Sequence, residues 1–229
     1  MARRKKEPQN VHRKNISKTA EKLFLKKGIE NTSMNEIAKE AGYSKATLYV
    51  YFKNKEELVG MLVLESMQEL QECIRLALEQ EKCTKERYEK ICHALVQYQE
   101  EYPFYFKIAQ ETINIDFESD HFLPEEKETF MVGEQINQLL MDFLKEGIAC
   151  GEIRSDIEML PTIFSLWGMA AGLIQIGSNK EAYITQQMEK SKTEFLSYGF
   201  AMLYRSIATE GGENDGKGNY TKMSIKKNG

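Results

Sequence analysis

The feature that most constrains the fold of this sequence is a dense series of helix start and stop signals between Ile16 and Leu58. Apolar residues spaced i, i+4, i+7 and i+8 predict a first helix that ends at Gly28. Its buried stripe consists of Ile16, Ala20, Leu23 and Phe24. Ser33 and Glu36 then have the spacing of a capping box, in which each side chain accepts from the other residue's backbone N–H. We therefore expect a second helix to begin directly after Ser33.

A third, short helix is predicted after a tight turn. Gly42 permits the positive φ that such a turn needs, and Ser44 is a good N-cap for a helix from Lys45 to about Tyr51. Asn54 and Glu57 form another capping pair, which opens a longer fourth helix. Three short helices around such a turn predict a helix-turn-helix, whose second helix enters the major groove of DNA.

The third helix carries side chains that can contact DNA. We expect Lys45, Thr47 and Tyr49 to reach base edges or phosphates, while Ala46 and Leu48 anchor the helix inward. We predict phosphate contacts for a further set of hydroxyls and lysines, which comprises Ser33, Ser44, Lys53 and Lys55. For any single residue, a purely structural role in capping or packing stays open. For the whole unit DNA binding is favoured, because caps, turn and spacing agree.

The run SMNEIAKEAGYSKATLYVYFKNKEEL, from Ser33 to Leu58 and preceded by AEKLFLKKGIENT, resembles the N-terminal DNA-binding domain of the TetR (tetracycline repressor) family of bacterial transcriptional regulators. The resemblance covers about a fifth of the chain, and the remainder carries no diagnostic motif. It implies a homodimer on a palindromic operator, an all-α C-terminal domain that binds a small molecule, and repression that the ligand relieves. It does not indicate which operator or which ligand.

The charge of the chain is divided unevenly along its length. Residues 1–60 hold 14 Lys and Arg against 7 Asp and Glu, a net charge of +7, so the chain's total of −4 leaves −11 for residues 61–229. A basic N-terminal part attracts phosphates although the whole chain is acidic. The polar start of the chain lacks the apolar run of a secretory signal. It is either a disordered arm or an arm that contacts DNA through Arg3, Arg4, Lys5 and Lys6.

The rest of the sequence has helical spacing without the alternation of strands, which predicts an all-α fold. We expect an N-terminal three-helix helix-turn-helix domain over residues 1–54 and a C-terminal helical domain for ligand binding and dimerisation over residues 55–208. A disordered tail is expected over residues 209–229, and a loop from Asn114 to Leu123. The later helices are predicted at Lys55–Gln80, Lys85–Glu101, a short aromatic segment from Tyr102, a helix opened by Pro124, Met159–Gly177, and Ala182–Ala208.

The segment from Met159 to Gly177 contains no charged residue over 19 positions, so its length permits a membrane span. Its glycines and polar residues favour a core helix of a protein that does not enter the membrane. Gly168 and Gly172 would let another helix approach closely. We therefore expect a four-helix dimer interface, although these residues could instead fill the core of one subunit. The expected dimer residues are Phe164, Gly168, Gly172, Phe195, Tyr198 and Met202.

The middle of the chain is rich in aromatic residues, which suit a pocket for apolar or cationic aromatic ligands. We predict a ligand site formed by Tyr98, Phe104, Ile108, Phe117, Phe130, Phe143 and Trp167. A counter-charge could come from Glu111, Asp116, Glu118 or Asp120. Aromatic residues at helical spacing are more often plain core, so that alternative stays open for each of them.

Metal, redox and enzymatic functions have little support in the sequence. The cysteines, Cys73, Cys83, Cys92 and Cys150, have no CxxC spacing, and the 3 histidines are scattered. We expect buried, inert thiols in a reducing cytoplasm, with a redox-sensing cysteine as the alternative. No phosphate loop, GxSxG or HExxH motif is present, so we expect no enzyme, cofactor or metal. The sequence thus predicts a cytoplasmic, ligand-responsive, dimeric DNA-binding repressor. The alternative is a DNA-binding regulator that a protein partner controls or that has no small-molecule ligand.

Overall fold

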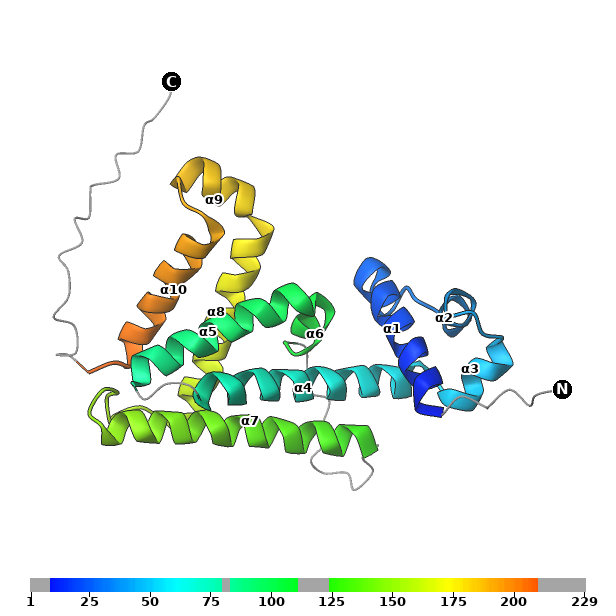
Figure 1. Ribbon diagram of the computed structural model, residues 1–229, viewed down its shortest axis with the longest axis horizontal. Helices are drawn as coiled ribbons and strands as arrows, with labels where there is room; N and C mark the ends of the chain where they lie inside the picture. Colours follow the sequence, from blue (N-terminus) through cyan, green and yellow to red (C-terminus); the bar gives the residue numbers. More distant parts are fainter. Residues whose placement is uncertain (1–8, 80–82, 111–123, 210–229) are drawn as a thin grey trace.

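The computed structural model describes residues 9–79, 83–110 and 124–209, and these residues form an all-helical chain (Figure 1). Their only β-type pairing is an isolated bridge between Ile153 and Ala208. The expected N-terminal arm, the Asn114–Leu123 loop and the tail after Thr209 lie outside the described residues. The helices are α1 (Gln9–Lys27), α2 (Met34–Glu40), α3 (Lys45–Tyr51), α4 (Lys55–Glu79), α5 (Thr84–Glu101), α6 (Pro103–Ile108), α7 (Pro124–Ala149), α8 (Met159–Asn179), α9 (Glu181–Met188) and α10 (Lys192–Ile207).

Helices α1 to α3 begin and end at the predicted local signals. The Ser33 hydroxyl accepts from Glu36 N at 3.3 Å while the Glu36 carboxylate accepts from Ser33 N at 3.0 Å, which confirms the capping box. Ser44 Oγ accepts from Thr47 N at 3.1 Å and so caps α3. Gly42 has a φ of 76°, the conformation that the predicted turn requires. The three helices pack together around a small core of Ile16, Ala20, Phe24, Ile37 and Leu48.

Helices α4–α10 form the body of the molecule. It is built around the two longest helices, α4 and α7, which lie side by side (Figure 1). Helix α5 packs against α4, and α8 packs against α7, α5 and α10. Leu58, Leu62, Leu70 and Ile74 belong to the buried face of α4. Helix α4 therefore links α1–α3 to the core of the body.

The prediction of one continuous helix from Ala182 to Ala208 is wrong, because the chain breaks between α9 and α10. Glu189 has a φ of 52°, in the left-handed region that ends helices. A second capping box then starts α10, in which Ser191 Oγ accepts from Glu194 N at 3.2 Å and the Glu194 carboxylate accepts from Ser191 N at 2.7 Å. The S-x-x-E spacing of Ser191 and Glu194 in the sequence could have indicated this start.

Helix α8 is the one helix of the described residues that is long and apolar enough to cross a membrane. Its inner face, with Ile163, Ala171 and Ile174, is buried against neighbouring helices. Its outer face remains apolar and exposed, and consists of Leu160, Phe164, Met169 and Ile176. An exposed apolar helix face of this kind is typical of a contact with another protein or with a membrane.

Candidate DNA-binding surface, apolar cavity and exposed helix face

Helix α3 is held from one side and open on the other. Leu48 and Phe52 are fully buried, whereas Lys45, Tyr49 and Val50 are exposed. The expectation that Ala46 anchors the helix inward is wrong, since Ala46 is exposed. Leu48 and the capping residue Phe52 supply the anchor instead, because they point into the core that α1 and α2 form.

The hydroxyls predicted to contact DNA already make hydrogen bonds within the chain. The Ser44 and Thr47 hydroxyl oxygens lie 2.8 Å apart, and the Ser33 hydroxyl donates to Glu36 at 3.0 Å. A hydroxyl has a second hydrogen-bonding position, so a phosphate contact stays compatible with these bonds. Contact of Ser33, Ser44 and Thr47 with DNA remains a prediction, as it does for Lys45 and Tyr49.

The two lysines after α3 differ in position. Lys53 is exposed, and its backbone N–H donates to the Glu57 carboxylate at 2.7 Å. The Lys55 ammonium instead donates to the backbone oxygens of Ile29 at 2.9 Å and Thr32 at 3.4 Å. Lys55 thus braces the connection between α1 and α2, a role that differs from the predicted phosphate contact.

Arg13 fixes the end of α3 and was missed in the sequence. Its guanidinium donates to Tyr51 O at 2.7 Å, pairs with Glu57 at 3.3 Å and lies 4.4 Å from the centre of the Phe52 ring. These contacts join α1 to α3 and to the start of α4. Because they span 38 to 44 residues, no local pattern could have indicated them. Arg13 therefore positions the exposed face of α3 relative to α4.

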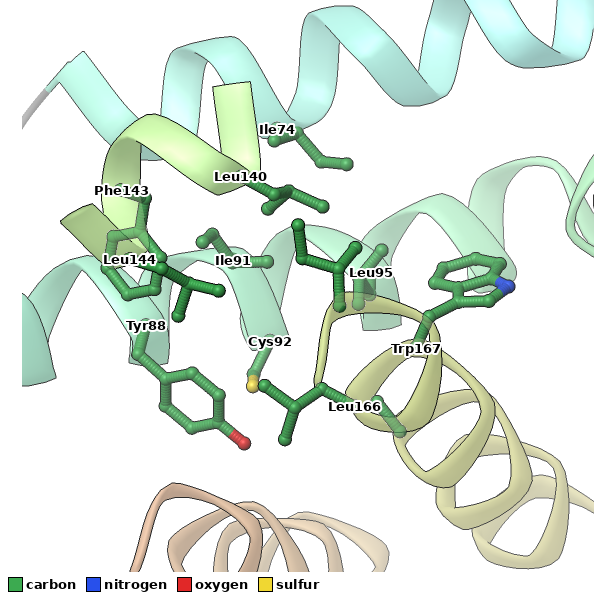
Figure 2. A pocket seen from close by; sticks show the side chains of 12 residues that line it. Ile74, Tyr88, Ile91, Cys92, Leu95, Leu140, Phe143, Leu144, Leu166 and Trp167 are labelled. Carbon is green, nitrogen blue, oxygen red and sulfur yellow. The ribbon is translucent and has the colours of Figure 1, made fainter. Parts of the chain in front are cut away.

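A cavity of about 70 Å³ lies in the body between α4, α5, α7 and α8 (Figure 2). Figure 2 shows Tyr88 and Trp167 at its two ends, with aliphatic side chains between them. The lining is apolar apart from the Tyr88 hydroxyl, the Cys92 thiol and the Trp167 indole. It consists of Ile74, Tyr88, Ile91, Cys92, Leu95, Leu140, Phe143, Leu144, Ile163, Leu166, Trp167 and Ala170.

The polar groups at this cavity are kept neutral. The Tyr88 hydroxyl donates to Phe200 O at 3.0 Å, and burial raises its pKa. Burial also raises the pKa of the Cys92 thiol to about 12. The expectation of buried thiols holds for Cys92 but is wrong for Cys150, which is exposed. The guanidinium of Arg87 lies 5.3 Å from the centre of the Phe143 ring and is paired with Glu146. Among the residues that the structure describes, no acidic or basic side chain lines the cavity.

Only part of the predicted ligand set lines this cavity. Phe143 and Trp167 do, whereas Phe130 is 40% exposed and Phe117 lies outside the described residues. The residues that were missed include a stripe on α5, which consists of Tyr88, Ile91, Cys92 and Leu95. Their i, i+3, i+4 and i+7 spacing marks one helix face and could have indicated them.

Three of the predicted ligand residues, Tyr98, Phe104 and Ile108, are buried outside the cavity lining. The Tyr98 hydroxyl donates to Ser66 O at 2.8 Å, which ties α5 to α4. The Phe104 ring lies 5.9 Å from that of Phe24, so α6 packs directly against α1. Phe104 thus belongs to the contact between the body and the three N-terminal helices.

The predicted dimer residues gather on α8 and α10, which pack against each other. Phe164, Tyr198 and Met202 are each 53% exposed, and Phe195 is half-buried. A Cβ added at Gly168 or Gly172 would meet no atom within 4 Å. The surface therefore has large apolar side chains beside open space over the glycines, which is a shape that a second helix pair can fill.

Known proteins resemble this chain over a short stretch by sequence and over most of its length by structure. The family model for "Bacterial regulatory proteins, tetR family" matches residues 16–62. Over 81 residues the chain is 38% identical to the HTH-type transcriptional regulator TtgR of Pseudomonas putida, covering 35% of this chain and 38% of TtgR. It is 51% identical over 47 residues to the HTH-type transcriptional regulator SAUSA300_2515 of Staphylococcus aureus, which is 20% of this chain and 25% of that relative. The chain thus matches less than two fifths of the length of these relatives.

Solved structures resemble almost the whole described chain. The ketosteroid transcriptional regulator KstR2 of Mycobacterium tuberculosis has a TM-score of 0.65 at 19% identity, covering 86% of this chain and 95% of KstR2. The transcriptional regulator FadR of Bacillus subtilis, solved in complex with stearoyl-CoA, has a TM-score of 0.63 at 18% identity, covering 83% of this chain and 97% of FadR. At these identities the likeness shows a common fold.

Proposed function

We propose, on the premise that the chain belongs to the tetR family of bacterial regulatory proteins, that it is a dimeric repressor which a small apolar molecule releases from a palindromic operator. The observation that carries the proposal is the family match over residues 16–62, which ends within α4 and includes the exposed face of α3. Residues 1–54 would bind DNA, and residues 55–208 would bind the effector and the second subunit. Such a protein acts in the cytoplasm, where the chromosome lies.

The effector that we propose is uncharged where it enters the cavity. A charged group buried among the lining side chains would lose its hydration without gaining a partner, at a cost of several kcal/mol. The described lining therefore disfavours a cationic ligand. The predicted counter-charges, Glu111, Asp116, Glu118 and Asp120, lie outside the described residues. The acyl chain of stearoyl-CoA, the ligand of the FadR structure, is an example of a suitable group.

Binding of a whole effector also requires the cavity to widen. Its volume of about 70 Å³ is well below the roughly 300–1,000 Å³ of ordinary ligand pockets. Because α4 contributes Ile74 to the lining and leads to α3 through Phe52, a displacement of α4 would change the position of α3. Widening of the cavity is thus a direct route from effector to DNA.

Selection of bound duplexes from a random-sequence DNA pool by the purified full chain tests the first part of the proposal. We expect enrichment of an inverted repeat, because a two-fold dimer presents two copies of α3. Failure to enrich any sequence contradicts sequence-specific binding to DNA.

Filling the cavity tests the second part. We expect Ala170→Leu to retain operator binding but to lose release by palmitoyl-CoA, oleate or an uncharged polycyclic aromatic compound, whichever releases the unchanged chain. Ala182→Leu, at an exposed position of α9, is the matched control and should behave as the unchanged chain. If none of these compounds releases the unchanged chain while a cell extract does so only through its protein fraction, control by a protein partner is favoured.

A further inference from the structure

The outer face of α3 carries an apolar side chain that neither the core nor the polar DNA contacts use. Val50 is 73% exposed, the largest exposed fraction among the exposed large hydrophobic residues of the described part of the chain. Ala46 lies one turn earlier and is also exposed, so the two share one face. Valine is a weaker helix former than alanine or leucine, so local helix stability does not account for it.

The surroundings of Val50 match the major groove of DNA better than another protein surface. Its exposed neighbours on α3 are Lys45 and Tyr49, a cation and a phenol. The N-terminal 60 residues carry a net charge of +7, which favours a polyanionic partner. The apolar surface suited to a second subunit lies elsewhere, on α8 and α10.

We infer that Val50, with Ala46 beside it, recognises a thymine in each operator half-site through the C5 methyl group. That methyl is the apolar feature which base pairs display in the major groove, and alanine or other aliphatic groups contact it. A cytosine at the same position lacks the methyl and presents an amino group, which valine cannot satisfy. The inference rests on the proposed DNA-binding function and adds a specificity-determining residue to it.

Replacement of thymine by uracil tests this directly, because it removes the methyl group and nothing else. In the operator selected by the full chain, each thymidine of a half-site is replaced in turn by deoxyuridine, and affinity is measured. We expect one position at which the replacement weakens binding by about 3- to 10-fold. Val50→Ala, which shortens the contacting side chain, should reduce the effect at that position alone, and the salt dependence of binding should stay unchanged because no charge is lost.

Leu25→Ala is the matched control, since Leu25 is an exposed apolar residue of α1 and is 51% exposed. It should keep the full sensitivity to uracil. Equal sensitivity of the unchanged chain and Val50→Ala at every thymine overturns the inference, as does a selected half-site without thymine. In both cases DNA binding itself survives, whereas a chain that enriches no duplex at all contradicts the proposed function together with this inference.

Discussion

Helices α1–α3 and the body from α4 onward are organised by different physics. The bounds of α1–α3 are set by caps and a glycine turn between residues a few positions apart, such as Ser44 with Thr47. The body is positioned by long-range apolar packing, such as that of α4 against α7. The first kind of order can be recognised in a local sequence pattern, whereas the second depends on which helix faces meet. The two parts therefore differ in how far their functions can be predicted.

The largest expected effect concerns the exposed face of the body. We expect Phe164→Glu on α8 to dissociate the dimer and to weaken operator binding by about 100-fold or more, because one subunit holds only one half-site. A carboxylate buried in an apolar interface has no partner to offset its desolvation. Sedimentation and DNA binding measured on the same samples check both effects.

Tyr183→Glu on α9 provides the matched control for this change, because Tyr183 is 58% exposed and was not assigned to the dimer face. It should remain dimeric. A Phe164→Glu variant that also remains dimeric would show that α8 and α10 do not form the interface.

The exposed face of α3 should give the next largest effect. We expect the double change of Lys45 and Tyr49 to alanine to weaken operator binding by about 30-fold or more, since two direct DNA contacts of at least roughly 1 kcal/mol each are lost. The midpoint of thermal unfolding should stay near that of the unchanged chain, because both side chains are exposed. Lys85→Ala on α5 is the control for a lost surface charge. Unchanged affinity of the double variant would refute the assignment of α3 as the helix that contacts the bases.

Two glycines of the body provide a contrast in stability. A Cβ at Gly147 would lie 2.5 Å from Ile153 Cδ1 and 2.9 Å from Thr84 Cγ2, and both of these residues are buried. We expect Gly147→Ala to lower the free energy of unfolding by about 1–3 kcal/mol. Gly168→Ala meets open space and should leave the unfolding of a monomeric Phe164→Glu background unchanged or slightly more stable. Urea denaturation measures both changes. A Gly147→Ala variant as stable as the unchanged chain would contradict the tight packing at Gly147.

The same division explains which features could be predicted from the sequence. The capping box at Ser33 and Glu36 and the bounds of α3 follow from neighbouring residues, and the structure confirms both. The break at Glu189 also has a local signal, the capping box of Ser191 and Glu194, but the apolar spacing continues across it and predicts one helix. The lining of the cavity could be predicted only in part, since it requires Ile91 on α5 and Ile163 on α8 to face each other.

The smallest expected effect concerns the capping box of α2, whose Glu36 also accepts a hydrogen bond from Lys27 on α1. The Lys27 ammonium donates to Glu36 at 2.8 Å, and this bond, followed by the bonds from Ser33, lowers the pKa of Glu36 from its ordinary 4.5 to about 2. A lowered carboxyl pKa stabilises the fold above pH 4.5, and that contribution is lost as the pH falls toward 2. We expect Lys27→Met to raise the pKa of Glu36 toward 4.5 in an NMR titration, while Lys26→Met leaves it low. If instead the pKa of Glu36 is equal in both variants, the capping box alone sets it. The bond from Lys27 on α1 to Glu36 on α2 then does not stabilise the ionised carboxylate.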